Sequence, residues 1–220
     1  MATTPIFVLE RGVNLTLSFG LHHRRSEAQR TSTVAADSRI LFEGGLVVMK
    51  TVILLGTAHR VQGAERGICN IEDPDYDTLV EQLWLTYSVD FVFEEASGLG
   101  PTFAEKFALT NIGPNRYKDI DPSAAGRKKL GIPAETGKDY RIGKLNFDTS
   151  HWGFGREELI EVQEKREHFW LPFIREQKFI RALVICGQAH LLSFAFRLKG
   201  EGFNVKAYSY MPYALLARPA

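Results

Sequence analysis

The sequence predicts an α/β protein, a three-layer α/β/α sandwich built on a mostly parallel sheet. Three short segments, 52–55, 89–93 and 182–186, have the length and the apolar composition of buried strands. Stretches with apolar residues at helical spacing lie between them along the chain. Strands that alternate with helices form parallel sheets, and the helices cover both faces of such a sheet.

Composition and charge restrict the class of protein. Of the 220 residues, 45% are hydrophobic and 24% are charged, which is typical of a globular domain. The 27 Lys and Arg residues nearly balance the 26 Asp and Glu residues, so the net charge of +1 gives no support for a nucleic-acid partner. Two cysteines, Cys69 and Cys186, are too few for a disulfide scaffold. The chain has no apolar run of about 18 residues and no stretch typical of a secretory signal, so we expect a cytoplasmic protein with no membrane partner.

The N-terminal segment 1–48 differs from the rest of the chain. Residues 22–39 are polar, and apart from an alternating stretch over 15–19, which predicts a short strand, the segment shows no sustained periodicity. A charged start at residues 49–51 then leads directly into the first apolar strand. We therefore expect residues 1–48 to be a poorly ordered extension and residues 49–220 to form a single α/β domain.

The first half of this domain contains two predicted strands and three predicted helices. The continuous apolar run over 52–55 suits a strand that is covered on both faces. Apolar residues at helical spacing predict a helix over 77–86, and the segment 89–93 follows as the second strand. Further helices are predicted over 102–109 and over 123–130, the latter with a turn sequence before it and a glycine after it.

The second half begins with the longest predicted helix, over 157–177, in which Pro172 favours a kink. The segment 182–186 is the third buried strand. Helical spacing continues over 191–199 and ends at a glycine, and the segment 205–208 is predicted to be the last strand.

Chemically versatile residues follow the predicted strands directly. The first strand leads into Gly56-Thr57-Ala58-His59, the third into Gly187-Gln188-Ala189-His190, and the second into Glu94 and Glu95. The carboxyl ends of parallel strands lie at one edge of a sheet, where ligands of α/β proteins bind. We therefore expect His59, His190 and one glutamate to share a cleft. Gly56 and Gly187 would let a substrate approach the backbone closely.

The donor types at this edge suit a divalent metal. Two imidazoles and a carboxylate leave an open position for water on a transition-metal ion. Glu94 and Glu95 are expected to point to opposite faces of the sheet, because successive side chains alternate along a strand. At most one of them then faces the site, and the other caps a helix or binds a basic residue.

Arg166 interrupts the apolar stripe of the long helix. The stripe consists of Leu159, Val162, Phe169 and Phe173. One interpretation is that the arginine stem packs on the stripe while the guanidinium reaches water. The other is that the guanidinium is buried against a carboxylate or binds an anionic substrate group, because a buried charge needs a partner. We predict that Arg166 is largely buried and contacts Glu94 or Glu95.

Two further residues are weaker candidates for substrate contact. Asp121 is explained most simply as part of a turn that starts a helix. His151 lies in the glycine-bearing loop 150–155 and fits a lid or a third metal ligand. Cys186 lies inside an apolar strand and is expected to be a core residue, and His168 is expected on the surface.

The two Gly-Xaa-Xaa-His motifs, a glutamate after the second strand and an arginine on the long helix together resemble the TraB/TIKI superfamily. That group is similar in turn to the erythromycin-esterase-like and ChaN-like proteins. Carried over, the resemblance places the two family histidines on His59 and His190 and the family arginine on Arg166. The family glutamate falls on Glu95, with Glu94 as the fallback.

The resemblance implies a metal-dependent hydrolase that cleaves a peptide, ester or lactone bond in a small-molecule or peptide substrate. TIKI-type members are described as proteases that use manganese or cobalt, and the esterase-like members hydrolyse a lactone. Here manganese, cobalt or zinc would be bound by His59, His190 and Glu95, and would lower the pKa of a bound water. Glu94 or Glu95 would act as general base and Arg166 would stabilise the oxyanion.

Three other functions remain open at this point. In a metal-free variant of the hydrolase, one of the histidines is the general base. ChaN-like members bind haem, so a binding protein for haem or another small ligand, without turnover, is the main alternative. An interaction protein whose exposed aromatic residues mediate dimerisation is the third. The sequence does not set the oligomeric state.

Overall fold

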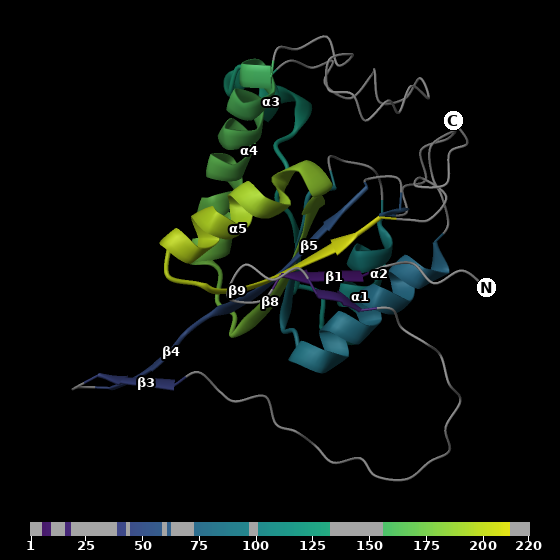
Figure 1. The fold of residues 1–220 in the computed structure, drawn as a ribbon, viewed down its shortest axis with the longest axis vertical. Helices are drawn as coiled ribbons and strands as arrows, with labels where there is room; N and C mark the ends of the chain where they lie inside the picture. The colour runs from purple at the N-terminus through teal and green to yellow at the C-terminus, as the bar shows by residue number, and fades with distance from the viewer. Residues whose placement is uncertain are drawn as a thin grey trace.

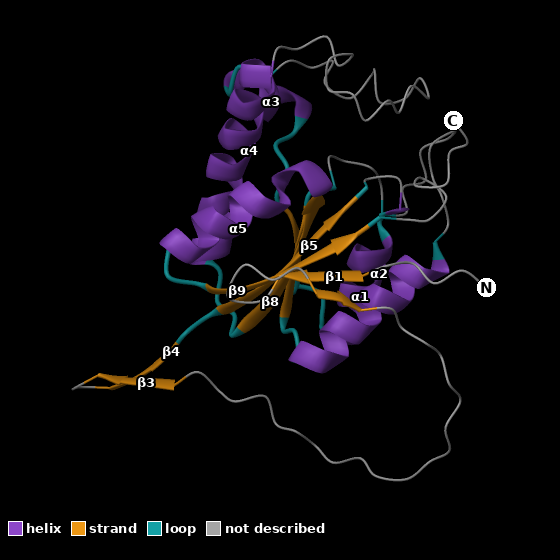
Figure 2. Ribbon diagram, viewed as in Figure 1, coloured by secondary structure: helices purple, strands orange, loops and turns teal. Residues whose placement is uncertain are grey.

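The computed structural model describes residues 6–9, 16–18, 39–42, 45–58, 61–62, 73–96, 101–132 and 156–211. Five parallel strands form the centre of the fold (Figures 1 and 2). They are β5 (Thr51–Thr57), β6 (Phe91–Glu94), β7 (Tyr117–Asp119), β8 (Arg181–Gly187) and β9 (Asn204–Tyr210). Their order across the sheet is β9-β5-β8-β6-β7, and each neighbouring pair is parallel. The predicted α/β class with a mostly parallel sheet is therefore confirmed.

The N-terminal segment contributes strands to the edge of this sheet. β1 (Ile6–Leu9) pairs antiparallel with β9, and β2 (Thr16–Ser18) pairs antiparallel with β1, so the described residues form a sheet of seven strands. β2 corresponds to the strand predicted over 15–19. β3 (Arg39–Phe42) and β4 (Gly45–Val48) form a separate antiparallel pair. The domain boundary near residue 49 stays a prediction.

The helices occur where the periodicity predicts them. They are α1 (Pro74–Tyr87), α2 (Phe103–Asn111), α3 (Ala124–Lys129), α4 (Arg156–Glu176) and α5 (Leu191–Gly200), the last preceded by the 3₁₀ turn η6 (Gln188–His190). Side chains of Asp73, Thr102 and Ser123 cap the first turns of α1, α2 and α3. Gly131 follows α3 with a φ of 66°, a left-handed conformation that glycine adopts at little cost. Within the described ranges, no helix is long and apolar enough to span a membrane.

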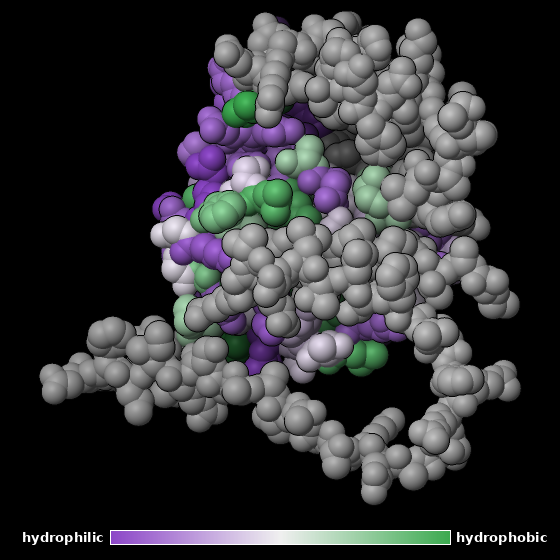
Figure 3. All heavy atoms as spheres, in the orientation of Figure 1, coloured by the Kyte–Doolittle hydropathy of each residue, from purple (hydrophilic) through white to green (hydrophobic). Residues whose placement is uncertain are grey.

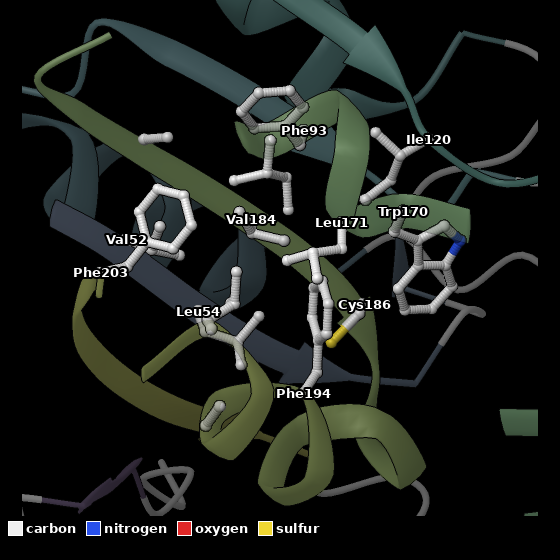
Figure 4. Packing of buried hydrophobic residues seen from close by; sticks show 14 of the residues in the cluster. Val52, Leu54, Phe93, Ile120, Trp170, Leu171, Val184, Cys186, Phe194 and Phe203 are labelled. Atoms are coloured by element: carbon white, nitrogen blue, oxygen red, sulfur yellow. The ribbon is translucent and has the colours of Figure 1, made fainter. Parts of the chain in front are cut away.

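Alternating residues of the strands face two helical layers. On β8, Ala182, Val184 and Cys186 pack under α4 and α5, as Figure 4 shows for part of this cluster. Leu183 and Ile185 of the same strand pack under α1 and α2. The sheet is therefore the middle of three layers, and Cys186 is a buried core residue as predicted.

The aromatic residues of the helices lie mainly in these two cores. Trp170 and Phe194 are fully buried, whereas Phe196 is 74% exposed beside the exposed Leu192, one turn earlier on α5. Figure 3 shows hydrophobic surface over this part of the molecule.

Candidate functional site

The carboxyl edge of the sheet brings together residues that are far apart in sequence. Glu95 follows β6, His190 ends η6 after β8, and Arg166 lies on α4. Asp121 lies in the turn between β7 and α3. Hydrogen bonds and ion pairs connect the four side chains on the α4/α5 face of the sheet. His59 and His151, which the sequence also places at the site, lie outside the described residues.

Arg166 is bound by two carboxylates. Its Nη2 pairs with Oε1 of Glu95 and lies 2.6 Å from Oδ1 of Asp121, and its Nε lies 3.1 Å from the same Oδ1. The arginine side chain is 14% exposed, and both carboxylate side chains are fully buried. Burial disfavours the charge, but the two carboxylates outweigh it and hold the pKa of Arg166 above its ordinary value. The prediction of a buried Arg166 in contact with Glu95 is confirmed, and the interpretation in which the guanidinium reaches water is wrong.

Asp121 does more than begin a helix. Its Oδ2 pairs with Nη2 of Arg127 on α3, while its Oδ1 accepts from Arg166 on α4. The carboxylate therefore joins α3 to α4. A contact between Asp121 and substrate stays a prediction.

Glu95 joins β8 to α4. One carboxylate oxygen pairs with Arg166, and the other accepts the backbone N–H of Gly187 at 2.7 Å. This bond orients the end of β8, from which the chain turns into η6 and reaches His190. Gly187 therefore acts here through its backbone, close to the carboxylate.

His190 is oriented by a carboxylate that the sequence analysis did not single out. Its Nδ1 lies 3.0 Å from Oε1 of Glu167. An ionised carboxylate can only accept, so Nδ1 is assigned as the donor and Nε2 carries the lone pair. Nε2 lies 3.5 Å from Nη1 of Arg166, and the ring packs edge to face with Trp170, with centroids 4.6 Å apart. His190 is 3% exposed.

Glu167 is fully buried. Besides His190, it accepts a hydrogen bond of 2.6 Å from Ser193 Oγ and one of 3.4 Å from Arg197 Nε. His190, Ser193 and Arg197 are three and seven residues apart, which places them on one face of a helix. In the sequence, this polar stripe and the acidic Glu167 on the preceding helix were the signal for these contacts.

Glu94 faces the other side of the sheet, as strand alternation predicts. Its carboxylate accepts from Gln62 Nε2 at 3.2 Å, from Thr102 Oγ1 at 2.5 Å and from Tyr117 OH at 3.0 Å. It is fully buried, and desolvation raises its pKa from 4.5 to about 7, although the hydroxyl hydrogen bonds oppose the shift. Glu94 therefore belongs to a polar cluster on the α1/α2 face and not to the site around His190.

The donors predicted to bind a metal are engaged otherwise in the described structure. Glu95 pairs with Arg166 and with the N–H of Gly187, and Nδ1 of His190 faces Glu167. A divalent ion bound to Glu95 would lie beside the Arg166 guanidinium, and like charges at such a separation repel. No group of three His, Cys, Asp or Glu side chains able to hold a metal occurs in the part of the chain that the structure describes. The described donors fit an ion-paired cluster better, and metal binding that includes His59 stays a prediction.

Gly56 shows why a residue without a side chain stands at the end of β5. A Cβ built on Gly56 would lie 2.9 Å from Gln188 Oε1 and 2.9 Å from Leu191 Cβ. The glycine therefore lets β5 pack closely against the turn that carries His190. Its predicted role in substrate binding remains a prediction.

Gly56→Ala is expected to destabilise the protein by about 1–3 kcal/mol, because the added methyl overpacks the junction of β5, η6 and α5. Urea denaturation measures the effect. Gly200→Ala is the matched control, because a Cβ at Gly200 meets nothing within 4 Å. An unchanged unfolding midpoint in Gly56→Ala would show that η6 shifts freely.

Comparisons with known proteins identify no relative from which a function could be inferred. No protein-family model matches this chain, and neither a curated protein nor a solved structure matches it. The resemblance to the TraB/TIKI superfamily therefore rests on the motif residues alone.

Proposed function

We propose that this protein is a hydrolase of an ester, lactone or peptide bond, with His190 as its general base. The observation that carries the proposal is the pair formed by Glu167 and His190 beside the buried guanidinium of Arg166. A carboxylate on Nδ1 fixes the orientation of the imidazole and stabilises the imidazolium that forms when Nε2 takes a proton.

The arrangement supports attack by water on a carbonyl carbon. Nε2 of His190 takes a proton from the water while the water oxygen bonds to the carbonyl carbon. Negative charge develops on the carbonyl oxygen, which Nη1 of Arg166 stabilises because Glu95 and Asp121 hold the guanidinium in place. The bond to the leaving group then breaks, and the leaving group receives the proton from His190.

Trp170 supplies a further hydrogen-bond donor next to His190 and Arg166. Its ring lies 5.2 Å from the guanidinium carbon of Arg166, and its buried Nε1–H has no hydrogen-bond partner within the described structure. An unpaired buried donor costs free energy, which a substrate oxygen that accepts from it would recover.

A screen of ester, lactone and peptide substrates tests the proposal, with EDTA and with added manganese, cobalt or zinc. For the substrate that the screen identifies, His190→Ala and Glu167→Gln are each expected to lower kcat by about 10²–10⁴-fold. Glu164→Gln, on the exposed side of the same helix, is the matched control and is expected to leave kcat unchanged.

Metal content of the purified protein and of His59→Ala separates the two forms of the hydrolase. Activity that survives EDTA supports His190 acting without a metal, and activity restored only by a metal supports the donor set with His59. Turnover that persists in His190→Ala contradicts the proposal. A negative screen together with a haem Soret band that is lost in His190→Ala would favour the binding protein instead.

A further inference from the structure

A chain of hydrogen bonds leads from the buried His190 to the surface of the molecule. Oε1 of Glu167, which lies 3.0 Å from Nδ1 of His190, also accepts from Ser193 Oγ at 2.6 Å. Oε2 of Glu167 accepts from Nε of Arg197, and Nη1 of Arg197 lies 2.7 Å from Nε2 of His168. Ser193 and His168 are exposed residues, whereas the glutamate and its imidazole partner are buried. The orientation of the buried pair therefore depends on groups at the surface.

The hydrogen-bond partners of His168 assign its two ring nitrogens. Nδ1 lies 2.8 Å from the backbone carbonyl oxygen of Glu164, which can only accept, so Nδ1 carries a hydrogen. The guanidinium of Arg197 can only donate, so Nε2 of His168 accepts from Nη1 with its lone pair. In this arrangement His168 is a neutral imidazole that connects Arg197 on α5 to the backbone of α4.

Arg197 competes with His190 for the carboxylate of Glu167. Where the geometry allows, an arginine binds a carboxylate through two parallel hydrogen bonds, and both partners of that pair are charged. The described bond from Arg197 to Glu167 is weaker than this: it comes from Nε, and its length of 3.4 Å exceeds the usual range of about 2.7–3.2 Å. Glu167 therefore keeps Oε1 for His190 although a full positive charge lies beside it.

Two contacts keep the carboxylate turned toward His190. Ser193 donates to the same oxygen that faces the imidazole, and its Oγ lies 3.3 Å from the backbone carbonyl oxygen of His190, so it contacts both members of the pair. His168 binds Nη1 of Arg197 and directs the guanidinium, whose side chain is 23% exposed, toward the surface. Without either contact, the guanidinium could bind both oxygens of Glu167 and take the lone pair that faces Nδ1 of His190.

We propose that Ser193 and His168 are positioning residues of the hydrolase site, which reserve Glu167 for His190 by restraining Arg197. The inference rests on the proposed function, because it concerns the general base of that reaction. It adds regulation of the same site: a contact at the surface, between His168 and Arg197, controls the orientation of a buried imidazole. Neither positioning residue touches the substrate.

NMR of the protein with isotope-labelled histidine tests the proposal without a substrate. The chain has 6 histidines, and the ring signals of His190 are assigned by their loss in His190→Gln. In the parent, we expect the Nδ1–H proton of His190 to exchange slowly with water, because it is buried and bonded to a carboxylate. Ser193→Ala and His168→Leu should each weaken this bond and speed the exchange by about 2–10-fold.

Arg197→Met distinguishes competition from a general loss of structure. Without the guanidinium nothing competes for Glu167, so adding Arg197→Met to Ser193→Ala or to His168→Leu should restore slow exchange. A merely structural contact would instead make each double variant worse than its single variants. His168→Gln, whose amide oxygen can accept from Arg197, should recover most of the loss seen in His168→Leu. Lys199→Met, at an exposed position of the same helix, is the matched control for a lost positive charge and should exchange as the parent does.

With a substrate from the screen, the same variants measure the effect on the reaction. Ser193→Ala and His168→Leu should each lower kcat by about 2–10-fold with little change in KM, and Arg197→Met should restore kcat in both. An unchanged exchange rate in either single variant, or double variants that are worse than the single ones, would overturn the proposal. Failure of the hydrolase proposal is a separate result, because a screen without turnover leaves the NMR measurement of His190 to decide whether Ser193 and His168 restrain Arg197.

Discussion

Arg166→Met is expected to lower the free energy of unfolding by about 3–5 kcal/mol. The substitution keeps an unbranched apolar stem but removes the cation between Glu95 and Asp121, whose side chains are fully buried. Asp121 keeps Arg127 as a partner, and Glu95 keeps the Gly187 N–H. Urea denaturation and thermal melts measure the loss.

The double variant Arg166→Met with Glu95→Gln distinguishes a lost ion pair from lost packing. If the penalty arises from loss of the ion pair with Glu95, neutralising Glu95 should recover part of the stability, and the two changes should not be additive. Arg175→Met, at an exposed position near the end of the same helix, should change stability by less than about 0.5 kcal/mol. Equal midpoints for Arg166→Met and the parent would exclude a structural role for this cluster.

Glu94→Gln is expected to remove a pH dependence of stability worth about 3 kcal/mol. Glu94 has a pKa of about 7 in the folded protein and 4.5 ordinarily, so between these values the folded state binds more protons than the unfolded state. Its contribution to stability is therefore fully present below pH 4.5 and is lost as the pH rises through 7. A difference of about 2.5 pKa units corresponds to roughly 3 kcal/mol.

The measurement compares unfolding free energies of the parent and of Glu94→Gln from pH 5 to pH 8. The difference between the two curves isolates Glu94 from all other titrating groups, and Glu94→Gln should gain stability relative to the parent as the pH rises. Glu81→Gln, exposed on α1, is the control and should give a curve parallel to that of the parent. A parallel curve for Glu94→Gln would mean that Glu94 is not desolvated.

The alternation of side chains on a single strand was predictable because it depends only on local backbone geometry. Glu94 and Glu95 are adjacent in sequence, and the period of two places them on opposite faces. In the structure, Glu94 accepts hydrogen bonds from Thr102 and Tyr117. Glu95 pairs with Arg166. Which glutamate meets the arginine was open in the sequence, because that contact depends on which face α4 covers.

Some elements carried too weak a local signal to be predicted. β7 has three residues, Tyr117–Asp119, and its pairing with β6 is set by the neighbouring strand and not by its own composition. The edge strand β1 likewise takes its place by pairing with β9, nearly two hundred positions later. Short strands are stabilised by their partners, so sequence periodicity alone does not reveal them.

What the sequence by itself determined is the α/β class, the order and approximate positions of the main strands and helices, and the common edge at which His190, Glu95 and the two glycines lie. These follow from periodicity and from the rule that parallel strands end at one edge. Only the tertiary structure decided that Glu167 orients His190 and that Asp121 shares Arg166 with Glu95. Arg166 and Glu95 are 71 residues apart, and Arg166 and Asp121 are 45 apart. Such contacts depend on how helices pack across the sheet, which no local pattern encodes.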